Sequence, residues 1–140
     1  MSRRIVPDVV RNQKIVSLSP ADFVRDAARM MRHRHVGSVL VMEGDRLVGI
    51  FTERDIVYRV VSEGRDPDLT PLAQVMTKDP DAIEDKATAL EALRRMHERG
   101  YRHLPVVDGR GRVVGIVSQR DFFGEEKAIL ESERPARPAR

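Results

Sequence analysis

The chain has 140 residues, of which 41% are hydrophobic and 34% charged, so it can form one compact domain or two small packed units beneath a solvated surface. It contains no cysteine, which excludes disulfides, thiolate metal ligands and a cysteine nucleophile. The net charge of +3 suits an anionic ligand, whereas an aromatic content of 4% argues against a base-stacking platform for nucleic acid.

The apolar residues are dispersed along the chain. No apolar run approaches the length of a membrane span, and Met1-Ser2-Arg3-Arg4 is not followed by the core of a signal peptide. We therefore expect a cytoplasmic protein without a membrane segment.

The first half of the chain predicts a strand, a helix, a β-hairpin and a second helix, in that order. Residues 15–18 predict the strand, and Ser19 followed by Pro20 is typical of a helix start. Apolar residues then recur at helical spacing, at Val24, Ala27, Ala28 and Met31. Apolar runs at 39–42 and 47–51 predict the hairpin. The second helix is expected to run from Thr52 to Gly64 and to turn inward Ile56, Val57, Val60 and Val61.

The second half predicts the same elements again. A strand is expected near residues 82–83, and the following helix, capped by Asp85, carries Ala89, Ala92, Leu93 and Met96 at helical spacing. Apolar runs at 104–107 and 113–117 predict a hairpin, and a last helix is expected to begin at Ser118.

Residue identities confirm that these halves are a tandem repeat. The offset is 65 positions before the hairpin turn, as for Met31 and Met96, and 66 after it, as for Gly49 and Gly115. Two copies are too few for a solenoid and predict two units that bury their apolar faces against each other. The predicted domains are a first repeat at 1–63, a linker at 64–71, a second repeat at 72–131 and a disordered, proline-rich tail at 132–140.

One short motif occurs at the same place in both repeats. It reads Gly-Ile-Phe-Thr-Glu-Arg-Asp at 49–55 and Gly-Ile-Val-Ser-Gln-Arg-Asp at 115–121, so each copy supplies one hydroxyl and one carboxylate. A duplicated pair of this kind indicates paired ligand binding and not a single catalytic centre. The sequence holds no nucleophile–base pair, and His33 and His35 lack a carboxylate at zinc-ligand spacing, so we expect neither an enzyme nor a metal site.

With these motifs in place, the chain resembles a cystathionine-β-synthase (CBS) domain pair over residues 8–128. The resemblance rests on the doubled motif and on residues 75–78, 101–108 and 113–118. It implies a mixed α/β (α+β) fold of two β-α-β-β-α repeats packed sheet to sheet about a pseudo-twofold axis. It further implies a homodimer and a regulatory adenosine ligand, with AMP foremost, then ATP, ADP or NAD(H), and S-adenosylmethionine as a further type. A separate regulated protein would read ligand occupancy.

The resemblance also assigns the polar residues of the site. One carboxylate can accept hydrogen bonds from both ribose hydroxyls, and the matching positions are Asp55 and Asp121. A phosphate favours a helix N-terminus, and the candidates there and nearby are Thr52, Ser118, Arg54, Arg120, Arg102 and His103. The first repeat has Gly37 and Ser38 in place of Arg102 and His103, which predicts clefts of unequal affinity.

The adenine slots are assigned by resemblance alone. One slot is expected to be walled by Val36, Gly37, Ser38, Ile50, Gln13, Lys14 and Ile15, and the other by Tyr101, Ile116, Lys78, Asp79 and Pro80.

Two other functions and one structural interpretation stay open. Thr52 with Asp55, and Ser118 with Asp121, also fit a helix capping box, which would leave a ligand-free dimeric module for protein interaction. The basic character of the chain suggests nucleic-acid binding, although its interleaved acidic residues argue against it.

Overall fold

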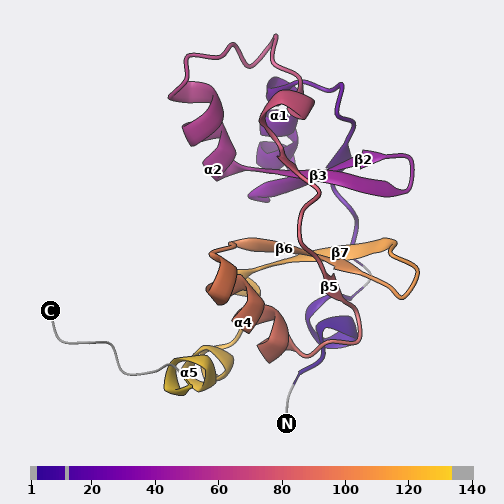
Figure 1. Cartoon of the computed structure of the whole chain (residues 1–140), viewed down its shortest axis with the longest axis vertical. Coiled ribbons are helices and arrows are strands. Elements are labelled where there is room, and N and C mark those ends of the chain that lie inside the picture. Colours follow the sequence, from indigo (N-terminus) through magenta and orange to yellow (C-terminus); the bar gives the residue numbers. More distant parts are fainter. Residues whose placement is uncertain (1–2, 12, 134–140) are drawn as a thin grey trace, which may run out of the picture. The chain divides into compact units, whose positions relative to one another are not determined.

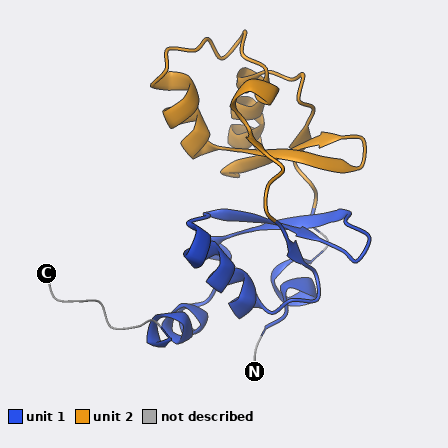
Figure 2. Cartoon of the chain, viewed as in Figure 1, with its two compact units in different colours: residues 1–13, 82–140 blue, residues 14–81 orange. Residues whose placement is uncertain are grey.

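The protein forms two compact units, each with its own sheet and its own hydrophobic core (Figures 1 and 2). The computed structural model describes residues 3–11 and 13–133. Unit 2 spans residues 14–81, and unit 1 combines residues 1–13 with residues 82–140. The predicted mixed α+β class and the β-α-β-β-α order of each repeat are confirmed. The repeat boundaries predicted from the sequence stay a prediction, and the compact units divide the chain at other positions.

Unit 2 is built on a four-stranded sheet. Its strands lie in the order β1 (Ser17–Leu18), β2 (Ser38–Glu43), β3 (Arg46–Thr52) and β4 (Thr77–Lys78). The first pair is parallel and the other two pairs are antiparallel. The β2–β3 hairpin turns at Gly44, whose φ of 58° lies in the left-handed region that glycine tolerates.

The helices of unit 2 cover this sheet with one apolar face each. They are α1 (Val24–Arg34), α2 (Glu53–Asp55), which continues into η2 (Ile56–Val61), and α3 (Leu72–Val75). Ala27 and Met31 of α1 pack into one buried cluster with Phe51 of β3. Burying a side chain of this size stabilises the fold by about 1.5–3 kcal/mol, so this cluster holds the hairpin against the helices.

Helix α1 begins at Val24, and the predicted start at Ser19 was wrong. Ser19 and Asp22 close a separate turn, in which the Ser19 amide donates to Asp22 Oδ2 at 2.7 Å. The amide of Val24 donates to the carbonyl of Thr70 at 3.0 Å, and the backbone of Phe23 is extended. The helix start thus combines a local cap, in which Asp26 Oδ2 accepts from the Phe23 amide at 2.9 Å, with an acceptor from a distant segment that local capping rules do not include.

The inward face of η2 is narrower than the sequence predicted. Val60 is buried and Ile56 half-buried, but Val57 and Val61 are 54% and 69% exposed. A helix packed on a sheet buries only one stripe of its surface, and Val57 and Val61 of this π-helical segment lie beside that stripe. Together with Tyr58 they form an exposed apolar surface on η2.

Unit 1 has a three-stranded sheet of the same design. The strands lie in the order β5 (Ile83–Glu84), β6 (His103–Val107) and β7 (Val113–Ser118), with the first pair parallel and the second antiparallel. The helical segments are η1 (Ile5–Val9), α4 (Ala89–Arg99), η3 (Gln119–Asp121) and α5 (Gly124–Ser132). Ile5 and Val10 of the N-terminal segment are buried in one core with Leu93 and Met96 of α4.

Two predicted features of unit 1 were wrong. Thr88, and not Asp85, caps α4, because its hydroxyl accepts from the Glu91 amide at 3.1 Å while Glu91 accepts from the Thr88 amide at 3.2 Å. The predicted last helix begins at Ser118 only as the short η3, and α5 starts separately at Gly124. Ser132 is the last residue of α5, the predicted tail at 132–140 stays a prediction, and its residues 134–140 lie outside the described residues.

The N-terminal segment is fastened to unit 1 by Arg3. Its guanidinium donates to both carboxylate oxygens of Glu126, at 2.6 and 3.1 Å, and to the carbonyl of Asp121 at 3.0 Å. It also stacks over the Phe123 ring at 3.5 Å from the ring centre. Burial raises the pKa of the Glu126 carboxyl, but the hydrogen bonds from Arg3 and from the Phe123 amide outweigh it, so this pKa lies below its ordinary value.

Candidate functional site

The first copy of the motif forms a tight turn between β3 and α2. The Thr52 amide donates to Asp55 Oδ2 at 3.0 Å, the Thr52 hydroxyl donates to the same oxygen at 3.1 Å, and the Asp55 amide donates to Thr52 Oγ1 at 3.2 Å. These reciprocal bonds are a capping box, and they fix the side chains of both residues at the start of the helix.

The second copy forms the same turn between β7 and η3. The Ser118 amide donates to Asp121 Oδ2 at 2.6 Å, and the Ser118 hydroxyl donates to it at 3.3 Å. The capping interpretation of the motif is therefore correct in both repeats. It does not exclude ligand binding, because a carboxylate has two oxygens and each can accept more than one hydrogen bond.

Each turn is anchored to the start of the neighbouring strand. The Glu53 amide donates to the carbonyl of Gly37 at 3.0 Å, and the Gln119 amide donates to the carbonyl of Arg102 at 3.2 Å. The register places Ser38 opposite Thr52 and His103 opposite Ser118. In unit 1 the predicted phosphate-binding pair Arg102 and His103 thus lies next to the second motif in space, although His103 and Ser118 are 15 positions apart in sequence.

The two aspartates differ in what their second oxygen contacts. Asp55 Oδ1 lies 3.5 Å from the guanidinium Nε of Arg59, and that guanidinium also donates to the carbonyls of Val75 and Met76. The repeat places Glu125 at the position of Arg59. Asp121 Oδ1 makes no hydrogen bond or ion pair with the part of the chain that the structure describes, and its side chain is exposed. An acceptor for a ribose hydroxyl is therefore more accessible in the second motif.

The basic residues of the motifs also differ. Arg54 lies over the ring of Tyr58, 5.2 Å from its centre. Arg102 and Arg120 are exposed and form no ion pair within residues 3–11 and 13–133. Sequence reasoning missed Arg59 as a partner of Asp55, although a carboxylate and an arginine four residues apart on a helix are a recognisable signal.

The motif glycines allow another segment to approach the strand closely. A Cβ at Gly115 would lie 2.6 Å from both Val10 Cγ1 and Gln13 Oε1. A Cβ at Gly49 would overlap the Met76 sulfur and lie 3.2 Å from the Thr77 carbonyl oxygen. The glycines therefore allow the segments near the start of each repeat to pack closely against β7 and β3.

The predicted adenine-slot residues fall in both units. Unit 1 holds Gln13, Tyr101 and Ile116, and unit 2 holds Lys14, Ile15, Val36, Gly37, Ser38, Ile50, Lys78 and Pro80. The resemblance placed Gln13 in one adenine slot with Ile50, and Lys78 in the other slot with Ile116. The structure instead bonds Gln13 to Ile116 and pairs Lys78 of β4 with Gly49 of β3. The role of these residues in a slot stays a prediction.

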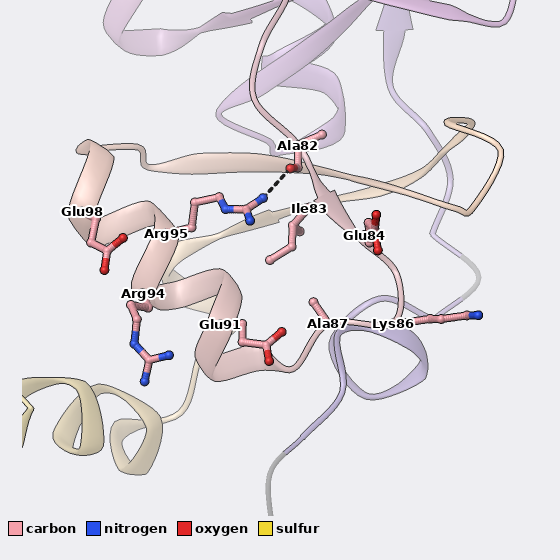
Figure 3. Close-up of a pocket in the computed structure, with 9 residues that line it drawn as sticks. All are labelled: Ala82, Ile83, Glu84, Lys86, Ala87, Glu91, Arg94, Arg95 and Glu98. Carbon is pink, nitrogen blue, oxygen red and sulfur yellow. Dashed lines mark hydrogen bonds between the residues drawn. The ribbon is translucent and has the colours of Figure 1, made fainter.

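A separate open cavity of about 570 Å³ lies on unit 1 beside α4 and β5 (Figure 3). Its charged lining consists of Glu84, Lys86, Glu91, Arg94, Arg95 and Glu98. Arg95 reaches across to donate to the carbonyl of Ala82 at 2.7 Å, and Arg94 is paired with Glu133 at 2.6 Å. None of the predicted binding residues lines this cavity, and within residues 3–11 and 13–133 no group of three or more potential metal ligands occurs.

Comparison with known proteins identifies the family. The CBS domain family model matches residues 6–62 and 72–127, so the chain belongs to the CBS domain family. A CBS domain-containing protein of Arabidopsis thaliana is 37% identical over 128 residues, which are 91% of this chain and 23% of that protein. The chain spans less than two thirds of the length of the first curated relatives that it matches.

Two solved structures show the same fold. A protein with CBS domains from Burkholderia ambifaria MC40-6 is 32% identical, with a TM-score of 0.76 and 90% of each chain covered. A CBS domain protein from Pyrobaculum aerophilum, complexed with AMP, is 27% identical, with a TM-score of 0.77 and coverage of 86% of this chain and 93% of that one. No helix in the described parts of this chain is long and apolar enough to cross a membrane.

Proposed function

We propose that this protein is a regulatory module that binds an adenine nucleotide, AMP foremost, and is not an enzyme. The observation that carries the proposal is the second motif, where Asp121 offers an accessible carboxylate oxygen beside the hydroxyl of Ser118. A ribose diol can donate two hydrogen bonds to such a carboxylate, and a phosphate is attracted to the exposed arginines nearby. The Pyrobaculum relative complexed with AMP supports the choice of nucleotide.

The two motifs are proposed to bind with unequal strength. At the first motif, Arg59 occupies the second oxygen of Asp55, and Gly37 and Ser38 supply no cation. At the second motif, Arg102 and Arg120 supply positive charge and Glu125 stands where Arg59 would be. We therefore assign the tighter site to the second motif. Occupancy can regulate a partner only if the nucleotide binds two conformations of the protein with different affinities.

A homodimer in the cytoplasm is part of the same proposal. The exposed apolar surface on η2, formed by Val57, Tyr58 and Val61, is a candidate contact between copies. A ligand-free module for protein interaction is the alternative, and the capping boxes give it a structural basis because they explain the motif without a nucleotide.

The test is a titration of AMP against wild type, Asp121→Ala and Asp55→Ala by isothermal calorimetry. We expect Asp121→Ala to lose the tighter binding event and Asp55→Ala to keep it. Asp45→Ala, in the exposed β2–β3 turn, removes a carboxylate of the same charge and is expected to bind as wild type does. Absence of AMP, ADP, ATP and NADH binding at millimolar concentration would contradict the proposal and favour the ligand-free alternative.

A further inference from the structure

The side chain of Gln13 makes a two-point contact with the backbone of Ile116. Its Nε2 donates to the Ile116 carbonyl at 3.1 Å, and its Oε1 accepts from the Ile116 amide at 2.6 Å. Ile116 lies on β7, the outer strand of the described sheet of unit 1, so these two polar groups face away from β6. The exposed carboxamide of Gln13 thus closes a short piece of sheet edge.

Unit 2 closes the equivalent edge in another way. The repeat matches Ile116 to Ile50 and Gln13 to Lys78. There, the backbone of β4 pairs with β3, with Thr77 opposite Ile50 and Lys78 opposite Gly49. Displacing that edge would require a strand to leave the sheet, whereas displacing Gln13 requires one exposed side chain to rotate. A ligand can therefore reach the sheet edge at Ile116 at a smaller cost in free energy than the equivalent edge at Ile50.

The chemistry of the contact indicates which ligand could replace Gln13. A carboxamide offers one donor and one acceptor side by side. The Watson–Crick edge of adenine offers the same pair, through its 6-amino group and N1, and proteins read such edges with hydrogen bonds. Ile116 precedes Ser118 by two residues, about 6.6 Å along a strand. A base held at Ile116 would have its ribose and phosphate near the second motif.

We infer that the amide and carbonyl of Ile116, which Gln13 occupies, are the groups that bind the adenine of a nucleotide at the second motif. Gln13 therefore competes with that adenine. Gln13 then sets both the affinity of this site and its preference for a base with an adjacent donor and acceptor. The inference rests on the proposed function, because it needs a nucleotide at Ser118 and Asp121.

The expected effect is modest because Gln13 is exposed and its bonds can be exchanged for bonds to water. Removing the Gln13–Ile116 hydrogen bonds, with a net contribution of about 1 kcal/mol, corresponds to about five-fold tighter binding of the nucleotide. Both Gln13→Ala and Gln13→Leu should show this gain, since each removes the carboxamide. Gln74→Ala is the matched control, because Gln74 is an exposed glutamine of unit 2 that contacts Arg65 and no candidate residue.

The experiment measures dissociation constants by calorimetry for AMP and for purine riboside 5′-monophosphate, which lacks the 6-amino donor. The inference expects AMP to bind both Gln13 variants about five-fold more tightly than wild type, with a smaller gain for the analogue. Hydrogen exchange of the Ile116 amide should be faster in Gln13→Ala than in wild type, and AMP should slow it again.

Each other result overturns the inference. If wild type binds AMP and the Gln13 variants bind it equally or more weakly, Gln13 does not compete with the base, and the proposed function stands. A gain confined to Gln13→Leu would mean that an apolar contact, and not release of the edge, strengthens binding. If neither wild type nor any variant binds AMP, the inference and the proposed function fail together.

Discussion

Replacing Arg3 by alanine should strongly destabilise unit 1. The Arg3–Glu126 ion pair is bidentate, and the two side chains are only 19% and 11% exposed. Removing one partner of a fully buried pair costs about 3–5 kcal/mol, because the remaining charge is left desolvated. Here the Phe123 amide still donates to Glu126 at 2.8 Å and some solvent reaches the pair, so we expect a loss of about 2 kcal/mol.

The loss should depend on pH in a defined direction. In the wild-type protein the pKa of Glu126 lies below its ordinary value, so the pair stabilises the fold above the pKa of an unfolded glutamate, about 4.3. That contribution disappears as pH falls through the folded pKa. Without Arg3, burial favours the neutral form of Glu126 and so raises its pKa. Protonation of Glu126 then removes the buried charge and reduces the destabilisation of the variant. The difference in unfolding free energy should therefore be largest near neutral pH and should shrink below about pH 4.

Urea unfolding followed by far-UV circular dichroism, at several pH values between 7 and 3, measures this difference. Arg25→Ala is the control, because the Arg25–Asp68 pair is 44% and 58% exposed and exposed pairs contribute little. A loss below about 0.5 kcal/mol at pH 7, or a difference that stays constant over the pH range, would refute the reasoning.

Two further predictions concern packing and assembly. Gly115→Ala should cost about 1–3 kcal/mol of unfolding free energy, because the new methyl group meets the stiff, buried Val10, whereas Gly49→Ala should cost less because the flexible Met76 thioether can move. Urea unfolding of both variants checks this, and equal losses would contradict it. Val61→Asp should shift a homodimer toward monomer in light scattering coupled to size-exclusion chromatography, because it places a charge on the exposed apolar surface of η2. An unchanged mass would remove that surface from the interface.

Much of the chain's organisation follows from its sequence because the signals are local. Apolar periodicity and turn glycines predicted both hairpins and both central helices, and an internal repeat predicted that they occur twice. The capping boxes at Thr52 and Ser118 were also predictable, since they join residues three positions apart.

Tertiary contacts decided what the sequence could not. At the start of helix α1, the Val24 amide donates to the carbonyl of Thr70, 46 positions away, in addition to the local cap by Asp26. Arg3 meets Glu126 across 123 positions, and Gln13 meets Ile116 across 103. Local propensity carries no information about such pairs, because their geometry exists only after the sheet and helices have packed. The sequence by itself thus determined the repeated elements and the motif residues. Only the tertiary structure decided that Asp121 keeps an accessible oxygen and that Gln13 covers the backbone of Ile116.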